Sequence, residues 1–342
     1  MAGVTFGNRI TTTTQEKFLP KLLDHVLNSN KLFTRFVGRA KKWSGEHMKF
    51  PIKVSSNTLG ASFSGFDTFS TSAVDTRRNL VYRPSFYEIP VSLPLDEIWV
   101  NATEEKVLDL IRIEVSSTAQ DMADALGTQF YATGTGKDFN GLELLVDDGT
   151  NNASIGGLTR SSFTPALNST VTAAASSQLT LAQMATLFSN VRSGGVEPSE
   201  IYTTETVGDL YEQLLQPQER IMKDVNEMRK GLFLGTGATA LAYKGKPVIV
   251  DEKCTSGIMY MINGDLMDFY AVSTKEGTQS IPYKSTDIEG NEYSSITGLG
   301  FSWSGWIKPT NSASLIGHIY FGGQFVQRAP KRSGKLTGIT SV

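Results

Sequence analysis

The sequence has little of the chemistry on which most enzymes and metal sites depend. Among its 342 residues there is one cysteine, Cys254, which cannot form an internal disulfide, so nothing requires an oxidising compartment. The three histidines, His25, His47 and His318, argue against a histidine-rich metal site and leave few bases for a Ser-His-Asp triad. Charged residues make up only 19% and the net charge is −2, which argues against tight sequence-specific DNA binding.

Long hydrophobic runs are also missing. No stretch approaches the roughly 18 consecutive apolar residues of a membrane span, and residues 1–15 lack the basic-then-apolar order of a secretory signal. Hydrophobic residues nevertheless reach 39% and aromatic residues 10%, which is enough to build a core and excludes wholesale disorder. We therefore expect a soluble, β-rich protein that is made inside the cell.

Three short motifs resemble ligand sites but lack the required context. Residues 235–240 match G-x-G-x-x-A, yet turn residues follow them where a dinucleotide site needs a helix. Residues 134–137 resemble part of a phosphate loop, but Asp138 stands where Ser or Thr should bind Mg²⁺, so we expect a helix stop. Residues 147–151 are acidic without the alternating EF-hand pattern, and we expect a solvated turn. No catalytic, metal or cofactor site remains.

The first hundred residues predict an arm followed by a hairpin. A helix is expected to start at Pro20, with apolar residues at helical spacing and Leu32, Phe33 and Phe36 beyond it. Residues 48–54 and 86–93 alternate with period two, as strands do. The Ser/Thr/Gly-rich stretch between them cannot bury itself, so it is either ordered by a partner or a flexible surface loop.

A long helix comes next. Asn101 and Glu104 have the spacing of an N-cap pair, and an apolar stripe runs with helical spacing from about Thr103 to Tyr131. At 1.5 Å per residue such a helix spans roughly 40 Å. Gly134 and Gly136 are expected to stop it.

An α/β region follows residue 178. Thr180 and Gln183 predict a capping box for a helix that ends at residues 194–195. Strands are predicted at 200–203, 247–250 and 257–262, with a helix at 207–215 and strand-like sequence again from 296 to 326. The polar segments 11–14 and 331–335 have little intrinsic tendency to order, so either they pack within the chain or neighbouring subunits hold them, and we expect the second.

This order of parts resembles the major capsid protein of tailed bacteriophages, which has the HK-ninety-seven-like fold. The similarity also extends to short runs. These are 139–142 and 155–159 after the long helix, 179–220 with Gly194–Pro198 and Ile201–Thr204, Lys244–Asp251, Tyr260–Asn263 and Arg328–Gly334.

The resemblance implies an α+β phage major capsid protein fold with a peripheral (P) domain sheet and an axial (A) domain of mixed sheet and helices. Its parts are expected to be an N-terminal arm (1–38), an extended E-loop hairpin with flanking strands (39–100), a spine helix (101–132), a G-loop with P-domain (133–177), an A-domain (178–275), and returning P-domain strands with a C-terminal tail (276–342).

The resemblance also implies a structural, non-enzymatic virion protein that self-assembles into pentamers and hexamers of an icosahedral head, in the host cytoplasm, around double-stranded DNA contacted non-specifically. Further expected partners are scaffolding, portal and decoration proteins, with no membrane. The candidate subunit contacts are Phe18, Leu22, Phe33, Phe63, Phe66, Phe69, Arg77, Arg78, Arg220, Lys223, Glu227, Arg229 and Arg332.

Two departures from the family pattern refine this expectation. Only residues 1–38 precede the hairpin region, which predicts a separate scaffolding protein or none. No lysine lies between Val54 and Thr76, which argues against a covalent cross-link through the loop. Two other interpretations remain, namely an encapsulin-like compartment shell and an α/β enzyme with a site in 180–275.

Overall fold

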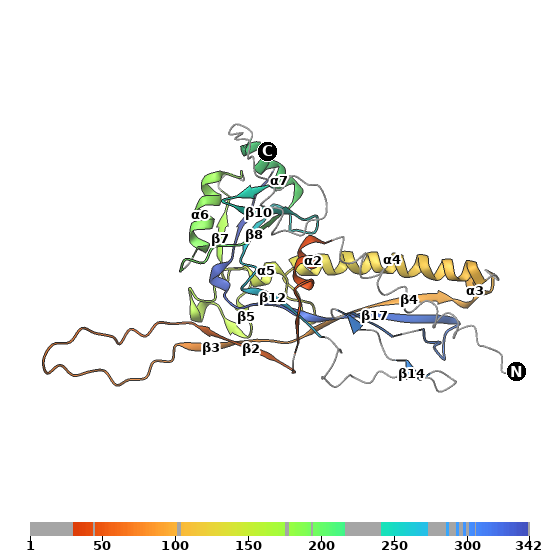
Figure 1. The fold of residues 1–342 in the computed structure, drawn as a ribbon, viewed down its shortest axis with the longest axis horizontal. Coiled ribbons are helices and arrows are strands. Elements are labelled where there is room, and N and C mark those ends of the chain that lie inside the picture. The colour runs from red at the N-terminus through yellow and green to blue at the C-terminus, as the bar shows by residue number, and fades with distance from the viewer. Residues whose placement is uncertain are drawn as a thin grey trace. The chain divides into compact units, whose positions relative to one another are not determined.

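The computed structural model divides the chain into two compact units, each built from segments far apart in the sequence (Figure 1). Unit 1 comprises 1–46, 84–141 and 268–325, and unit 2 comprises 47–83, 142–267 and 326–342. The structure describes residues 30–43, 45–100, 104–174, 178–192, 194–215, 241–272, 285–286, 292–293, 297–298, 301–304 and 306–340.

Unit 1 is organised around the helix α4 (Glu104–Tyr131), whose 28 residues confirm the predicted long helix. The predicted stripe is buried from Val115 through Ala119, Met122 and Leu126 to Phe130. The helix ends before Gly134, which has a φ of +70°. A Cβ at Gly134 would lie 2.5 Å from the carbonyl oxygen of Phe139, so glycine is required at this stop.

The short helix α2 (Lys31–Val37) packs against α4. Its Phe33 ring lies 5.0 Å from that of Phe130, measured between centroids, and Leu32 and Phe36 are also buried. Asn30, just before α2, donates a 2.6 Å hydrogen bond from Nδ2 to the carbonyl of Ala123. The predicted apolar character of this segment is confirmed. The predicted helix start at Pro20 and the predicted Asn101 cap lie outside the described residues.

The six-stranded sheet of unit 1 lies beside these helices. Its central strand β17 (Ser314–Gln327) pairs antiparallel with β4 (Ser85–Pro94), from Ser314 opposite Pro94 to Gly323 opposite Ser85. Its remaining strands are β1 (Lys41–Lys42), β12 (Met267–Ala271), β15 (Thr297–Gly298) and β16 (Phe301–Trp303), and a separate pair is formed by β13 (Ser285–Thr286) and β14 (Glu292–Tyr293). The short helix α3 (Leu95–Val100) follows β4.

The predicted hairpin is real, but its predicted return strand is wrong. β2 (Met48–Lys53) pairs antiparallel with β3 (Arg77–Tyr82) in unit 2, whereas β4 belongs to the sheet of unit 1. Tyr82 explains why segment 77–82 stays in unit 2, because its side chain is buried there and donates a 2.8 Å hydrogen bond to the carbonyl of Gln327. Segment 77–82 therefore has its own core contacts, and residues 83–84, which belong to neither strand, separate it from β4.

The second six-stranded sheet gives unit 2 its core. Its strand order is β7-β18-β11-β8-β10-β9, and the helices α6 and α7 pack against one face. The strands are β7 (Thr170–Ala173), β8 (Glu200–Thr203), β9 (Ala242–Tyr243), β10 (Lys246–Val250), β11 (Met259–Ile262) and β18 (Gly334–Thr337), and the helices are α6 (Leu181–Val191) and α7 (Glu205–Leu215).

The predicted elements of this region are confirmed, including the capping box at the start of α6. Thr180 Oγ1 accepts a hydrogen bond from the Gln183 backbone at 3.3 Å, and Gln183 Oε1 accepts one from the Thr180 backbone at 3.0 Å. Segment 141–177, which precedes this region, contains several short elements. It forms α5 (Leu142–Leu145), β5 (Ser154–Ile155), β6 (Leu158–Thr159), a 3₁₀ turn η1 (Ser161–Phe163) and β7.

The expectation that neighbouring subunits hold segment 331–335 is wrong. Residues 330–332 form a 3₁₀ turn (η4), and β18 lies inside the sheet, antiparallel to β11 and parallel to β7. Glycine at position 334 allows β18 to lie close to α6, since a Cβ there would lie 2.7 Å from the side chains of Leu187 and Val191. The segment is ordered by its own subunit. Residues 11–14 lie outside the described part of the chain.

Candidate assembly surfaces

The loop between β2 and β3 has no core of its own. Every residue from 55 to 75 is exposed, and the Phe66 side chain has no contact that reduces its exposure, at 105% of the reference value. Phe63 and Phe69 are 68% and 67% exposed, and their rings meet edge to face with centroids 5.2 Å apart. This polar loop therefore carries three exposed phenylalanines close together in sequence, of which Phe63 and Phe69 touch, and we call the three the apolar cluster.

A local turn shapes this cluster. The Ser64 backbone N–H donates a 2.8 Å hydrogen bond to Asp67 Oδ2, and Gly65 between them has a φ of +58°. Side chains of Asp accept backbone hydrogen bonds in this way at turns. Phe66 lies within this turn and is fully exposed, between the paired Phe63 and Phe69 along the chain.

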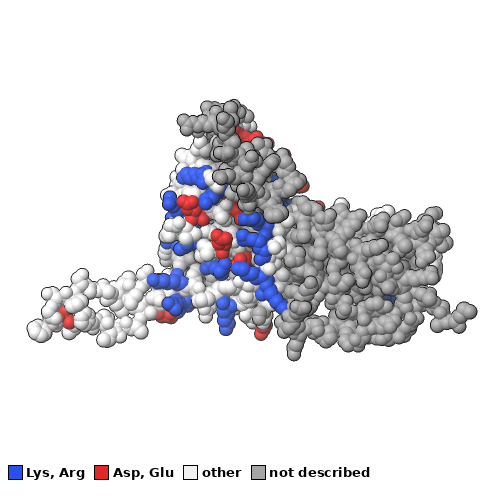
Figure 2. All heavy atoms as spheres, viewed as in Figure 1, with Lys and Arg blue, Asp and Glu red and all other residues white. Residues whose placement is uncertain are grey.

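At the base of the loop the two strands carry positive charge on one face. Lys49, Lys53 and Arg77 are exposed, and Lys53 lies directly opposite Arg77 in the register. We call these three residues the cationic ribbon face. Figure 2 shows blue side chains gathered where the almost uncharged loop begins.

Arg78 points to the other face, so the adjacent candidates Arg77 and Arg78 have different surroundings. Its guanidinium forms an ion pair with Asp75 and lies over the Phe163 ring, 5.7 Å from the centroid. Asp75 is fully exposed, and its hydrogen bond with Arg78 keeps the pKa of its carboxyl below the usual value. Arg78 thus ties the base of the loop to η1 of the same unit.

The remaining predicted contacts have different outcomes. Phe33 is completely buried inside unit 1, so its selection as a subunit contact is wrong, because the core of its own chain takes up the ring. Arg332 is half-buried in η4, close to Gly194. Phe18, Leu22, Arg220, Lys223, Glu227 and Arg229 lie outside the described residues.

An acidic stripe on α7 was missed by the sequence reasoning. Glu205, Asp209 and Glu212 are all exposed, and their spacing of four and three residues places them on one side of the helix. The opposite side carries Val207 and Tyr211 into the core. The stripe could have been predicted from the sequence, because the stretch 205–215 contains three acidic and no basic residues.

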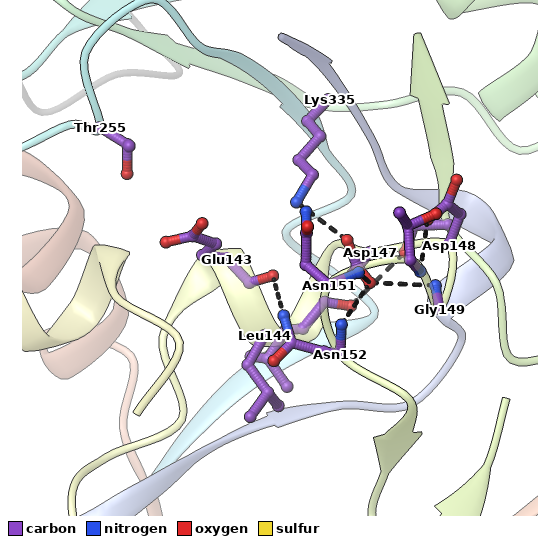
Figure 3. A network of polar contacts seen from close by, with 12 residues as sticks. Glu143, Leu144, Asp147, Asp148, Gly149, Asn151, Asn152, Thr255 and Lys335 are labelled. Atoms are coloured by element: carbon purple, nitrogen blue, oxygen red, sulfur yellow. Dashed lines mark hydrogen bonds and ion pairs between the residues drawn. The ribbon is translucent and has the colours of Figure 1, made fainter. Parts of the chain in front are cut away.

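The predicted solvated turn at 147–151 is wrong for Asp147, which lies in a buried polar centre, whereas Thr150 and Asn151 are exposed as expected. Asp147 is completely buried, and its Oδ2 accepts backbone hydrogen bonds from Gly149 (3.0 Å), Asn151 (3.2 Å) and Asn152 (2.9 Å). Figure 3 shows the Lys335 side chain reaching the same carboxylate, with 3.2 Å between Nζ and Oδ1. The carboxylate closes its own loop and anchors β18.

Arg160 completes this centre. Its guanidinium donates to the carbonyl oxygens of Asp147 (2.7 Å), Leu144 (2.7 Å) and Leu167, and the side chain is completely buried. Burial lowers its pKa, while the Asp147 carboxylate acts in the opposite direction. Arginine remains protonated under such conditions. The guanidinium therefore satisfies carbonyls that would otherwise be buried without a partner.

The charge state of Asp147 suits a structural role. Burial opposes ionisation of its carboxyl, but the backbone N–H groups of Asn152 and Gly149 and the Lys335 ammonium outweigh that effect, so its pKa lies below the usual value. A carboxylate stabilised as an anion on both oxygens is a poor general base or nucleophile. The centre holds the loop 147–152 and β18 together.

Other candidate chemistry is structural as well. Cys254 is buried, and burial raises the pKa of its thiol. Asp138 accepts hydrogen bonds from the backbone and hydroxyl of Thr135, which confirms the predicted helix stop. Within the described ranges, no three metal-ligating side chains cluster, and no helix has the length and apolarity to cross a bilayer. The segment 235–240 lies outside these ranges.

Comparison with solved structures identifies the fold. The chain is similar to the capsid of cyanophage A-1(L), with a TM-score of 0.60 and 16% identity over 91% of this chain and 93% of that chain. It is also similar to the capsid of the Myoviridae phage XM1, with a TM-score of 0.51 and 12% identity over 90% and 92% of the two chains. The chain has the HK-ninety-seven-like capsid fold.

The same fold occurs in the SrpI encapsulin from Synechococcus elongatus, with a TM-score of 0.54 and 12% identity over 89% of this chain and 86% of that chain. No protein-family model and no curated protein matches the sequence. The HK-ninety-seven-like fold is therefore recognised here through structure, and the expected α+β class is confirmed.

Proposed function

We propose that this chain is the major capsid protein of a tailed double-stranded DNA phage, which self-assembles through pentamers and hexamers into an icosahedral head. The observation that carries the proposal is the exposed loop of residues 54–76 with its three phenylalanines. In a monomer these apolar side chains stay exposed to water and add no stability, whereas an apolar cluster on a polar arm is a typical contact for another subunit.

In this proposal the elements take the roles of the family. The β2–β3 loop is the E-loop, α4 is the spine helix, the sheet of unit 1 is the P-domain sheet, and the β8–β11 sheet with α6 and α7 belongs to the A-domain. The E-loop lies over an adjacent subunit, where Phe63, Phe66 and Phe69 are the anchors. The proposed further contacts are Phe18, Leu22, Arg77, Arg78, Arg220, Lys223, Glu227, Arg229 and Arg332.

The energetics favour many weak contacts over one strong contact. Burying a phenylalanine side chain contributes roughly 1.5–3 kcal/mol, and a shell repeats the contact at every subunit. Each interface can therefore be weak while the closed particle is stable. The net charge of −2 also suits a container, because a strongly cationic lining would hold packaged DNA and oppose its movement.

The proposed partners follow from this role. They are other copies of the chain, portal and decoration proteins, packaged DNA contacted without sequence preference, and either a scaffolding protein or no scaffold. Assembly takes place in the host cytoplasm, and the mature location is the virion. The subunit acts structurally rather than as an enzyme.

Negative-stain electron microscopy and sedimentation velocity of the purified chain test the proposal. We expect closed shells, or discrete pentamers and hexamers, from the natural sequence. The variant Phe63→Ser/Phe66→Ser/Phe69→Ser should assemble poorly, while Thr58→Ala/Ser62→Ala/Ser70→Ala in the same loop should assemble normally. A stable monomer of the natural sequence at high concentration would contradict the proposal and favour the enzyme interpretation with a site in 180–275.

An encapsulin-like compartment shell is the second candidate, and the similarity to the SrpI encapsulin favours it. Both candidates predict shells, so their contents distinguish them. Particles purified from the native source should hold double-stranded DNA if the chain is a phage capsid protein. A single co-purified enzyme and no nucleic acid would show the compartment function instead.

A further inference from the structure

The cationic ribbon face has an arrangement that is unfavourable in an isolated subunit. Lys53 and Arg77 are directly opposite each other across β2 and β3, and like charges at such positions destabilise a strand pair. Asp75, two residues before Arg77, forms its ion pair with Arg78 on the other face. No described residue forms an ion pair with Lys49, Lys53 or Arg77.

The acidic stripe of α7 is also unfavourable in an isolated subunit, here because negative charges lie close together. Glu205 and Asp209 are four residues apart, where like charges destabilise a helix. Among the described side chains none forms an ion pair with Glu205, Asp209 or Glu212. Each surface thus carries three charges whose mutual repulsion a complementary surface would relieve.

The two surfaces also match in extent. Lys49 and Lys53 are four strand residues apart, which corresponds to about 13 Å. Glu205 and Glu212 are seven helical residues apart, which corresponds to about 10 Å. Both surfaces belong to unit 2, but within the unit β2–β3 and α7 lie well apart in Figure 1. One copy therefore does not bring them together.

We propose that the cationic ribbon face of one copy binds the acidic stripe of α7 on a second copy. This inference rests on the proposed function, because it concerns contacts within the assembly. Two different surfaces of the same chain form a head-to-tail interface, and such interfaces generate closed rings when the rotation closes. Electrostatic complementarity of this kind selects register and partner.

A second copy accounts for more of the structure than nucleic acid does. Phosphate groups would neutralise the ribbon face but would leave the α7 stripe without a counter-charge from any described residue. A single contact between copies neutralises both, and it agrees with the near-zero net charge of the chain. Binding of the ribbon face to nucleic acid remains an outcome that the experiment below can reveal.

Charge reversal tests the proposal in the full-length chain. The ribbon variant is Lys49→Glu/Lys53→Glu/Arg77→Glu, and the helix variant is Glu205→Lys/Asp209→Lys/Glu212→Lys. The control, Lys137→Glu/Lys308→Glu/Lys331→Glu, changes the net charge as the ribbon variant does but at other exposed positions. Circular dichroism first establishes that each variant is folded.

Sedimentation velocity and electron microscopy then measure assembly. We expect each reversed variant to need at least about tenfold more protein to assemble than the natural chain, while the control and a chain carrying both sets of reversals assemble normally. An equal mixture of the two variants should form hexameric rings but not pentameric rings, because the variants must alternate around a ring and only an even number of subunits allows this.

Three outcomes would overturn the proposal. The reversed variants could assemble like the control, the doubly reversed chain could fail to assemble, or the ribbon variant could form normal shells while losing binding to a short DNA duplex. The last result would assign the ribbon face to nucleic acid. If the natural chain itself does not assemble, the proposed capsid function is wrong. If the natural chain assembles but the variants give one of the three outcomes above, only the proposed contact is wrong.

Discussion

Lys335 and Asp147 form an ion pair with almost no access to solvent. The distance between Nζ and Oδ1 is 3.2 Å, and the side chains are 1% and 0% exposed. The pair joins strand β18 to the turn that follows α5. Because the other carboxylate oxygen already accepts three backbone hydrogen bonds, the turn is formed around the charge that Lys335 neutralises.

Removing the cation should therefore destabilise unit 2 strongly. The substitution Lys335→Met leaves Asp147 as an uncompensated buried charge, and breaking a buried pair in this way costs about 3–5 kcal/mol. Chemical denaturation of the unassembled subunit measures the loss. The control Lys331→Met removes an exposed lysine four residues earlier and should change the free energy of unfolding by less than about 0.5 kcal/mol. Equal effects of both substitutions would contradict this role.

Acid should weaken the same centre. The pKa of Asp147 in the folded state lies below its ordinary value of 3.8, so the unfolded chain binds a proton at a higher pH than the folded chain does. The stabilisation is fully present above about pH 5 and is lost as the pH falls below about 4 and through the folded-state pKa.

The variant Asp147→Asn isolates this contribution. It should be less stable than the natural chain at pH 7, and its free energy of unfolding should change less between pH 5 and pH 3. Denaturation curves at several pH values measure both slopes. Identical slopes would show that Asp147 titrates alike in both states.

The contact between α2 and α4 depends on the absence of a side chain at Gly127. A Cβ there would lie 2.2 Å from Asn30 Oδ1. Gly127→Ala should consequently displace Asn30 and destabilise unit 1 by about 1–3 kcal/mol, although alanine is the better helix former. Ser117→Ala on the exposed side of α4 is the control, and thermal unfolding compares them. A stabilising Gly127→Ala would show that helix propensity outweighs the Asn30 contact.

The capping box of α6 gives a smaller and local effect. Thr180→Ala removes the acceptor for the Gln183 backbone and should cost about 1 kcal/mol. Thr186→Ala, inside the same helix, loses only a bond from its hydroxyl to the Ala182 carbonyl and serves as the control. The midpoint of urea unfolding measures both variants, and a Thr180→Ala midpoint equal to that of Thr186→Ala would argue against a role for the cap.

The elements that could be predicted from sequence have local causes. Spacings of three and four residues can be read from the sequence alone. They define the stripe from Val115 to Phe130 and the capping pair of Thr180 and Gln183. The apolar residues of the exposed loop, Phe63, Phe66 and Phe69, stand among Ser, Thr and Gly, so their lack of a local core was also visible.

The errors concern features that depend on distant partners. The return strand of the hairpin was misassigned because β4 alternates as clearly as β3 does, and only the pairing of β4 with β17 separates them. Asp147 looked like a surface residue because Lys335, which neutralises it, is far along the chain. Burial of Phe33 likewise requires Phe130 and Phe321.

The position of β18 has a consequence for protein synthesis. β18 lies between β7 and β11, yet it leaves the ribosome roughly 160 residues after β7. At about 5–20 residues per second this delay is on the order of 10 seconds. During that time β7 has no neighbour on its inner edge and Asp147 has no cation. The six-stranded sheet of unit 2 can therefore be completed only once residues 334–337 have emerged, long after its other strands have been made.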